Sequence, residues 1–229
     1  MIIVNNLQVT YSGNIILNQL STSFMLNQIH GIVGLNGSGK TTFLNTLYGL
    51  KQPDQGNISF QNRRLLKSDM AYLVTENFFY SNITGYEYLS LYNNKKFDLA
   101  GWNSLFNLPL DTIIDNYSTG MKKKLALMGI LKQDKKIIIL DEPFNGLDIE
   151  SVSIVRLILL QLKELQYTII LTSHSIETLT NLCDYIFYLD KGKINSTISR
   201  EHFPEFQQLL YQNIESKNQS SITNLLTNN

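Results

Sequence analysis

The chain of 229 residues is poor in cysteine, and this scarcity excludes several kinds of site. Its single cysteine, Cys183, cannot form an internal disulfide, and the chain cannot supply the Cys/His sets that bind structural zinc. We therefore expect a reducing compartment. We also expect Cys183 to be a small buried side chain, because free cysteine behaves in this way in most proteins.

The sequence also lacks an excess of charge of either sign. It carries 19 Lys and Arg against 19 Asp and Glu, so its formal net charge is zero. Nucleic-acid binders carry a basic excess because neutralising phosphates drives their affinity. We therefore expect no nucleic-acid partner.

Long hydrophobic runs are missing as well. Apolar runs such as residues 137–140 are far shorter than the roughly 20 residues of a membrane-spanning helix. The first residues show no basic segment followed by a long apolar stretch, so we expect no secretion signal. With 43% hydrophobic and 17% charged residues, the composition is that of a globular protein. We expect one domain over residues 1–215 and a polar, loosely ordered tail over residues 216–229, which are rich in Asn, Ser and Thr.

The hydrophobic patterns predict an α/β fold. Alternation predicts two N-terminal strands, at 2–9 and 15–24, that form an antiparallel β subdomain. Nearly continuous apolar runs are typical of strands covered on both faces, as in a mostly parallel sheet. Such runs lie at 29–33, 70–74, 137–140 and 167–171. Helical periodicity predicts helices at 41–50 and 152–165, an inserted helical subdomain at about 78–133, and a short helix after residue 200; residues 185–194 read as a hairpin.

A glycine-rich loop follows the strand at 29–33. Residues 34–41 match the phosphate-binding pattern G-x-x-x-x-G-K-[ST] of P-loop NTPases. The glycines let successive backbone N–H groups face the phosphates, and the following helix adds its positive end. Lys40 would reach the β- and γ-phosphates, and the Thr41 hydroxyl would bind Mg²⁺. The ATP-binding residues predicted here are Gly34, Asn36, Gly37, Ser38, Gly39, Lys40, Thr41 and Thr42.

Two acids end the apolar run at 137–140. Asp141 would support Mg²⁺, and Glu142 is placed to polarise the attacking water as a general base. His174 ends the next apolar strand at the same edge of the sheet, near the γ-phosphate. A structural role for this lone histidine is the alternative, since histidine at a strand end is more often structural.

Two further motifs carry a resemblance to a family. Residues 117–121, Tyr-Ser-Thr-Gly-Met, resemble the signature L-S-G-G-Q of ABC (ATP-binding cassette) ATPases, and residues 145–148, Asn-Gly-Leu-Asp, resemble their D-loop. The motifs occur in the family's order from Tyr11 to about residue 194. The chain is thus identified as similar to ABC nucleotide-binding subunits over nearly its whole length.

The resemblance implies a head-to-tail dimer that encloses two ATP molecules. Ser118 and Gly120 would contact the γ-phosphate held by the other subunit, and Asp148 would belong to the D-loop. His174 matches the family's switch histidine and Tyr11 its adenine-stacking aromatic, although Tyr11 also reads as a surface aromatic at a strand end. The implied catalytic residues are Glu142, His174 and Lys40.

One departure concerns the loop after residues 70–74, where the family carries a Gln that touches Mg²⁺ and the transport subunit. Thr75 stands at that position, and we expect it in the metal site with Thr41 and Asp141. If the alignment with the family shifts by one residue, Glu76 takes the place of Thr75. The basic run after the signature reads as a solvated helix face at Lys122 and Lys123.

The function that we expect is an ATPase that powers export of an unknown substrate through a separate membrane-spanning subunit. It would lie in the cytoplasm at the inner face of the membrane. The signature and residues 79–89 resemble bacterial drug-resistance and bacteriocin-immunity exporters of the ABC-2 type. The alternatives are an ABC ATPase that transports nothing, such as the iron–sulfur assembly type, and a nucleotide-binding regulator without turnover.

Overall fold

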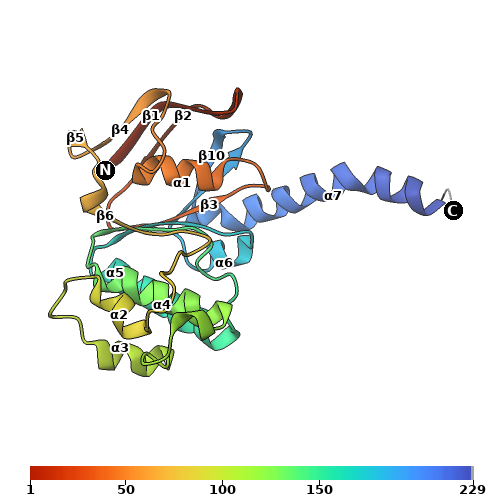
Figure 1. Cartoon of the computed structure of the whole chain (residues 1–229). Coiled ribbons are helices and arrows are strands. Elements are labelled where there is room, and N and C mark those ends of the chain that lie inside the picture. The colour runs from red at the N-terminus through yellow and green to blue at the C-terminus, as the bar shows by residue number, and fades with distance from the viewer. Residues whose placement is uncertain (228–229) are drawn as a thin grey trace.

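The structure is a computed structural model that describes residues 1–227, and it contains two sheets (Figure 1). The smaller sheet is antiparallel, with the order β2-β1-β4-β5. Its strands are β1 (Ile2–Tyr11), β2 (Asn14–Phe24), β4 (Gln55–Phe60) and β5 (Arg63–Arg64). The sequence patterns predicted β1 and β2 but not β4 and β5.

The larger sheet has six strands in the order β10-β9-β3-β8-β7-β6. Its strands are β3 (Ile29–Val33), β6 (Met70–Leu73), β7 (Ile137–Leu140), β8 (Thr168–Thr172), β9 (Tyr185–Asp190) and β10 (Lys193–Ser199). The pairings from β9 to β6 are parallel, and β10 pairs with β9 as an antiparallel hairpin. The predicted mostly parallel sheet is confirmed. The carboxyl ends of its central strands β3, β7 and β8 therefore meet at one edge.

The helices cover both faces of the larger sheet. They are α1 (Lys40–Tyr48), α2 (Gly85–Ser90), α3 (Leu99–Phe106), α4 (Thr119–Lys132), α5 (Ile149–Glu164), α6 (Ile176–Thr180) and α7 (Phe203–Thr227). Short 3₁₀ turns lie at Lys67–Asp69, Ile114–Asn116 and Arg200–His202. Figure 1 shows α1 between the two sheets and α2 to α5 on the opposite side of the larger sheet. The helices α2, α3 and α4 fall within the predicted insertion.

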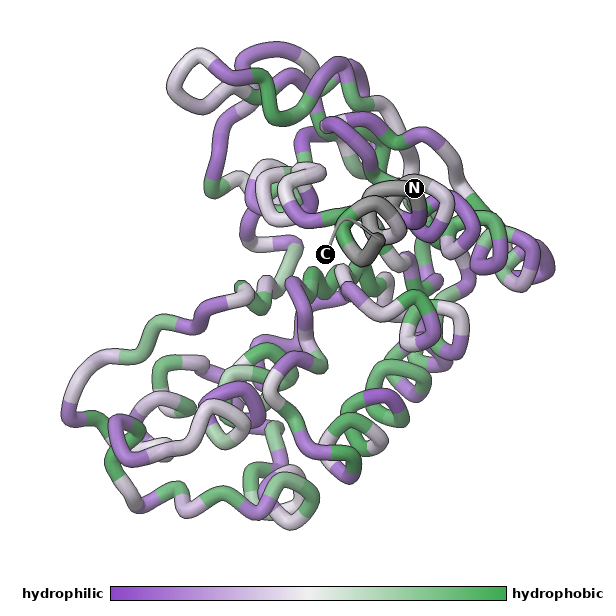
Figure 2. Tube along the Cα trace, turned by 90° about the vertical axis from the view of Figure 1, so that its right-hand side faces the viewer, coloured by the Kyte–Doolittle hydropathy of each residue, from purple (hydrophilic) through white to green (hydrophobic). Residues whose placement is uncertain are grey.

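Two hydrophobic cores result from this layering. Phe43 and Leu44 of α1 pack in the core between the sheets together with Ile137 and Ile139 of β7. The intervening Ile138 packs on the other face, with α4 and α5. Because side chains alternate along a strand, both faces of β7 are buried, and this explains its unbroken apolar run. In Figure 2 hydrophobic stretches lie in the middle of the molecule, and hydrophilic stretches are frequent around its outside.

The C-terminal segment differs from the prediction. We expected residues 216–229 to be a loosely ordered tail. In the described part of that segment α7 continues as a helix to Thr227 and projects away from the body of the molecule (Figure 1), and residues 228–229 lie outside the described residues. Its first turns pack through Phe203 and Phe206 on the core. Farther along, the hydroxyl of Ser216 donates to the carbonyl of Gln212, four residues earlier, the local bond that serine forms inside helices. Within residues 1–227, no helix combines the length and apolar character needed to cross a membrane.

Candidate active site

The phosphate-binding loop lies between β3 and α1, where two glycines are required by the backbone. A Cβ at Gly34 would stand 2.2 Å from the carbonyl oxygen of Leu189, so a larger residue does not fit. Gly39 has φ 108° and occupies the N-cap position of α1, where no side chain caps the helix. The first N–H groups of α1 are therefore left for another acceptor, as at other anion-binding helix starts.

Lys40 begins α1 and folds back over this loop. Its Nζ donates to the carbonyl oxygens of Gly34 at 2.8 Å and Leu35 at 3.2 Å, and the side chain is buried. Burial lowers the pKa of Lys40, while the nearby carboxylates of Glu142 and Asp141 act in the opposite direction. Among the described residues, the hydrogen-bond partners of this ammonium are thus two neutral carbonyl groups, which a phosphate could replace.

Asp141 forms the centre of a hydroxyl cluster at the end of β7. Its carboxylate is 1% exposed and accepts hydrogen bonds from Thr41 at 2.8 Å, Thr75 at 2.7 Å and Thr172 at 2.6 Å. Thr41 and Asp141, which the sequence predicted to share a metal site, are therefore in contact, and Thr75 lies beside them. A carboxylate and hydroxyl oxygens are the hard ligands that suit Mg²⁺ rather than a softer metal.

Glu142 adopts an uncommon backbone conformation next to this cluster. Its φ is 51°, a left-handed value that is rare for residues other than glycine. The Thr172 hydroxyl accepts the Glu142 N–H at 2.9 Å and so bridges the two adjacent acids. Glu142 Oε1 lies 3.1 Å from His174 Nε2, without the alignment of a hydrogen bond. Burial raises the pKa of Glu142, an effect opposed by the nearby His174 and Lys40. A buried carboxylate with raised proton affinity has the properties of a general base.

These residues line one open cavity of about 390 Å³. The structure thus brings together the phosphate loop, both acids, Thr75 and the half-exposed His174. The lining residues are Ile16, Asn36, Gly37, Gly39, Lys40, Thr41, Thr42, Thr75, Asp141, Glu142 and His174. The predicted adenine-stacking residue Tyr11 is not among them. Its ring lies 4.8 Å from the Lys51 ammonium, and β2 contributes Ile16 to the cavity instead.

The signature residues lie outside this cavity. The Ser118 hydroxyl caps α4 by accepting the Met121 N–H at 3.2 Å, and Asp148 caps α5 in the same way. A Cβ at Gly120 would stand 2.9 Å from the Gly146 carbonyl oxygen, so the signature packs closely on the D-loop of its own chain. Among the described residues, neither Ser118 nor Gly120 lines the phosphate-loop cavity.

The prediction for Lys123 is wrong. It reads as part of a solvated helix face, but its side chain is 5% exposed and its Nζ lies 3.4 Å from the carbonyl oxygen of Thr75. Sequence reasoning also missed the role of Thr172, whose hydroxyl contacts both acids. The signal for Thr172 was present, since a hydroxyl residue ends the apolar run of β8 at the sheet edge where Asp141 lies.

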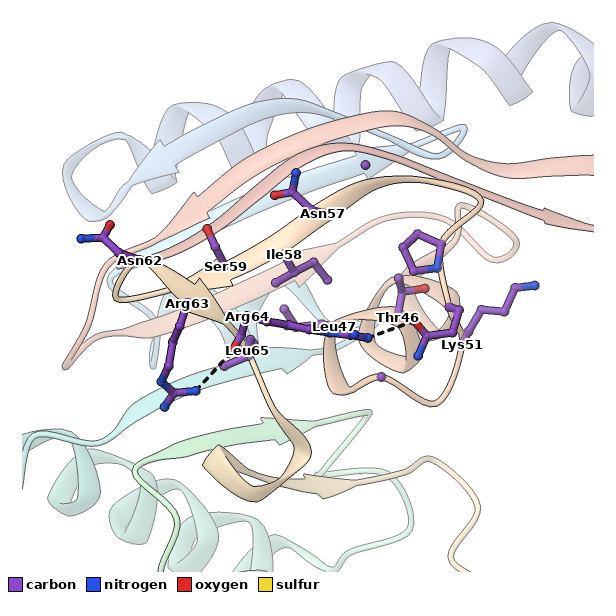
Figure 3. Close-up of a pocket in the computed structure, with 14 residues that line it drawn as sticks. Thr46, Leu47, Lys51, Asn57, Ile58, Ser59, Asn62, Arg63, Arg64 and Leu65 are labelled. Carbon is purple, nitrogen blue, oxygen red and sulfur yellow. Dashed lines mark hydrogen bonds between the residues drawn. The ribbon is translucent and has the colours of Figure 1, made fainter.

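A second cavity, of about 570 Å³, lies between the carboxyl end of α1 and the strands β4 and β5 (Figure 3). Its two arginines already have partners. Arg63 forms an ion pair with Asp69 at 2.7 Å, and Arg64 donates to Gln52 at 3.1 Å. It shares no lining residue with the phosphate-loop cavity.

A phosphate loop at the carboxyl edge of a parallel sheet, facing an aspartate and a glutamate that follow another strand of the same sheet, defines a P-loop nucleotide-binding ATPase. The family model described as "ABC transporter" matches residues 17–145. The chain belongs to this family, and it is the ATP-binding, ATP-hydrolysing subunit of an ABC transporter.

Relatives agree with this assignment. The chain is 32% identical to the uncharacterized ABC transporter ATP-binding protein YybJ of Bacillus subtilis, over 86% of this chain and 96% of YybJ. It is 28% identical to the lantibiotic transport ATP-binding protein SrtF of Streptococcus pyogenes, over 85% of this chain and 89% of SrtF.

Two solved structures share the fold. An ATP-binding subunit of an ABC transporter superposes with a TM-score of 0.81 at 24% identity, over 87% of this chain and 90% of that chain. The ATP-binding cassette MJ0796, solved as a dimer in a post-hydrolysis state with ADP and Pi, gives 0.77 at 19% identity, over 87% of this chain and 99% of that chain.

Proposed function

We propose that this chain hydrolyses ATP with Mg²⁺ between two nucleotide-binding subunits and thereby powers export through a separate membrane-spanning subunit at the inner face of the cell membrane. The observation that carries the proposal is the convergence of Lys40, Asp141, Glu142 and His174 on one cavity at the start of α1.

The hydrolytic step follows from this arrangement. Lys40 would exchange its carbonyl partners for the β- and γ-phosphates, while the free N–H groups of α1 hold the remaining oxygens. Thr41 and Asp141 would hold Mg²⁺, with Thr75 beside them. Mg²⁺ held there would offset the negative charge of the phosphates.

Glu142 would then accept a proton from the water that attacks the γ-phosphorus. The bond between that phosphorus and the bridging oxygen breaks, and ADP leaves with the bonding electrons. His174 lies close enough to Glu142 to orient it, and it would also contact the γ-phosphate.

A head-to-tail dimer would complete the site. Ser118 and Gly120 lie outside the cavity of their own chain, so a second copy is the simplest source of a signature for it. The cassette MJ0796, whose fold this chain shares, was solved as a dimer, which supports the pairing of two such subunits. Tyr11, which is 45% exposed, would swing from Lys51 to stack on adenine, and the D-loop with Asp148 would lie at the dimer interface.

The loop between β6 and α2 offers a surface for the membrane subunit. Phe78 and Tyr80 are 78% and 61% exposed, and their rings meet edge to face at 5.4 Å. Large exposed aromatic pairs of this kind mark interaction sites rather than ordinary surface. The likeness to a lantibiotic transport protein supports export of a peptide antibiotic or a similar compound.

The experiment is a tagged pulldown from detergent-solubilised cells, with bound proteins identified by mass spectrometry. We expect a polytopic membrane protein to be recovered with the wild type and lost with the double variant Phe78→Asp/Tyr80→Asp. The matched control is Leu165→Asp, which places a charge at an exposed apolar residue at the carboxyl end of α5. Recovery of soluble partners alone would contradict the transport role while leaving ATP hydrolysis intact.

A further inference from the structure

Lys123 is a buried ammonium that the hydrolytic step does not use. It lies in the second turn of α4, the helix that begins immediately after the signature residue Ser118. Its neighbours Lys122 and Lys124 are partly exposed, whereas Lys123 is 5% exposed. An ammonium can donate three hydrogen bonds. Among the described residues Lys123 makes one, to the carbonyl oxygen of Thr75 at 3.4 Å.

The buried charge is compensated by the catalytic acids. Burial lowers the pKa of Lys123, and the carboxylates of Asp141 and Glu142 attract the ammonium. Burying a charged lysine is costly unless such partners are near. Its position is therefore best explained by a role next to the active site rather than by packing alone.

Thr75 connects Lys123 to the metal site. Thr75 accepts from Lys123 through its backbone oxygen, and its hydroxyl donates to Asp141 at 2.7 Å. Threonine has a short side chain, so its hydroxyl reaches Asp141 only while the loop backbone lies close to β7. Lys123 holds that backbone from the side of α4. A groove of about 280 Å³ lies beside this contact, lined by Thr75 and Lys123 together with the signature residue Thr119 and the D-loop residue Gly146.

We propose that Lys123 is a positioning residue that keeps the Thr75 hydroxyl on Asp141 and so links the signature helix to the Mg²⁺ site. This inference rests on the proposed function. A displacement of α4 when a second subunit docks on the signature would move the Thr75 backbone, and with it one of the three hydroxyl partners of Asp141.

The test compares Lys123→Met, which removes the charge and the donor, with Lys123→Gln, which keeps an N–H donor on a side chain that is one bond shorter. Titration calorimetry measures ATP affinity with and without Mg²⁺. We expect Lys123→Met to weaken the Mg²⁺-dependent part of the affinity by roughly 10- to 100-fold, the usual effect of losing a residue that orients a metal ligand. Affinity without Mg²⁺ should not change, and Lys123→Gln should recover most of the loss. Lys132→Met, at the far end of α4, is the control.

A double-mutant cycle with Thr75→Val tests the route through Thr75. If Lys123 acts through the Thr75 hydroxyl, the double variant loses no more Mg²⁺-dependent affinity than the worse single variant. Additive losses, or Lys123→Met with wild-type Mg²⁺ dependence, would overturn the inference. If Lys123→Met does not fold, the same cycle is run with Lys123→Ala and Lys123→Gln. Equal Mg²⁺ dependence of ATP affinity in these two variants would overturn the inference. A wild type without Mg²⁺-dependent ATP binding would instead contradict the proposed function itself.

Discussion

Replacement of Thr172 by valine tests how Glu142 is held. The Thr172 hydroxyl is fully buried, donates to the Asp141 carboxylate at 2.6 Å and accepts the Glu142 N–H at 2.9 Å. Valine has nearly the same shape but neither hydrogen bond. The loss of a bond to a charged group and an unpaired buried N–H together cost roughly 2–5 kcal/mol of unfolding free energy.

The larger effect should be on turnover. Glu142 has φ 51°, a strained value for glutamate that persists only where its surroundings hold it. The bond from its N–H to Thr172 is one of those constraints. Without it the carboxylate shifts from its position beside His174, and displacements of about 1 Å at a reacting group cost up to roughly 100-fold in rate. We therefore expect Thr172→Val to lower ATP turnover by roughly 10- to 100-fold.

The assay is steady-state ATP hydrolysis. Urea unfolding first establishes a temperature at which every variant is folded, and turnover is measured at that temperature. Thr168→Val is the matched control: Thr168 lies at the other end of β8, is equally buried, and accepts one backbone N–H, from Asn27 at 2.9 Å. It should lose stability but keep its turnover. Thr172→Ser should keep both hydrogen bonds and most activity. Equal turnover losses in Thr172→Val and Thr168→Val would refute the reasoning.

Three further predictions concern separate parts of the molecule. Lys40→Ala should weaken ATP binding because it removes the buried ammonium at the loop; unchanged affinity by titration calorimetry would count against the phosphate-loop assignment. Gly120→Ala should leave ATP binding intact but lower turnover. The new Cβ would stand 2.9 Å from the Gly146 carbonyl oxygen and would push the signature away from the D-loop. Full turnover in a hydrolysis assay would show that this contact adapts freely. His30 is 1% exposed, and burial lowers its pKa from 6.5 to about 4. Between pH 6.5 and pH 4 the imidazole is therefore protonated in the unfolded chain but neutral in the folded one. Stability should then be fully present above pH 6.5 and fall by roughly 3 kcal/mol towards pH 4. Urea unfolding of His30→Phe should show a weaker dependence over that range, and an unaltered dependence would exclude His30 as its source.

The central parts of the fold and of the site could be predicted because they are encoded locally. The phosphate loop is one continuous segment, and Asp141 and Glu142 directly follow a buried strand of the same parallel sheet, whose carboxyl edge they share with the loop. The strand β4 escaped prediction because Gln55 and Asn57 give it a polar pattern. Its pairing with β1 spans about fifty residues of chain, so no local signal marks it.

Lys123 could not be assigned from sequence for a related reason. Three lysines occupy residues 122–124, and successive helix residues point about 100° apart, so one of them faces inward. Hydrophobic periodicity does not identify which, because α4 is buried on nearly every side from Leu125 to Ile130. Only the packing of α4 against the loop at Thr75 decides it. The helix α7 was missed beyond Ser216 because Ser and Asn favour loops by composition.

The measurement that tests the central claim most directly is ATP turnover by Glu142→Gln, with ATP affinity determined on the same preparation. This change keeps the shape of the side chain and removes its ability to accept a proton. Loss of a general base lowers rates by roughly 10²- to 10⁴-fold. We predict a loss of that size with ATP affinity close to that of the wild type. Turnover near the wild-type rate would show that Glu142 is not the base and would contradict the account of this site.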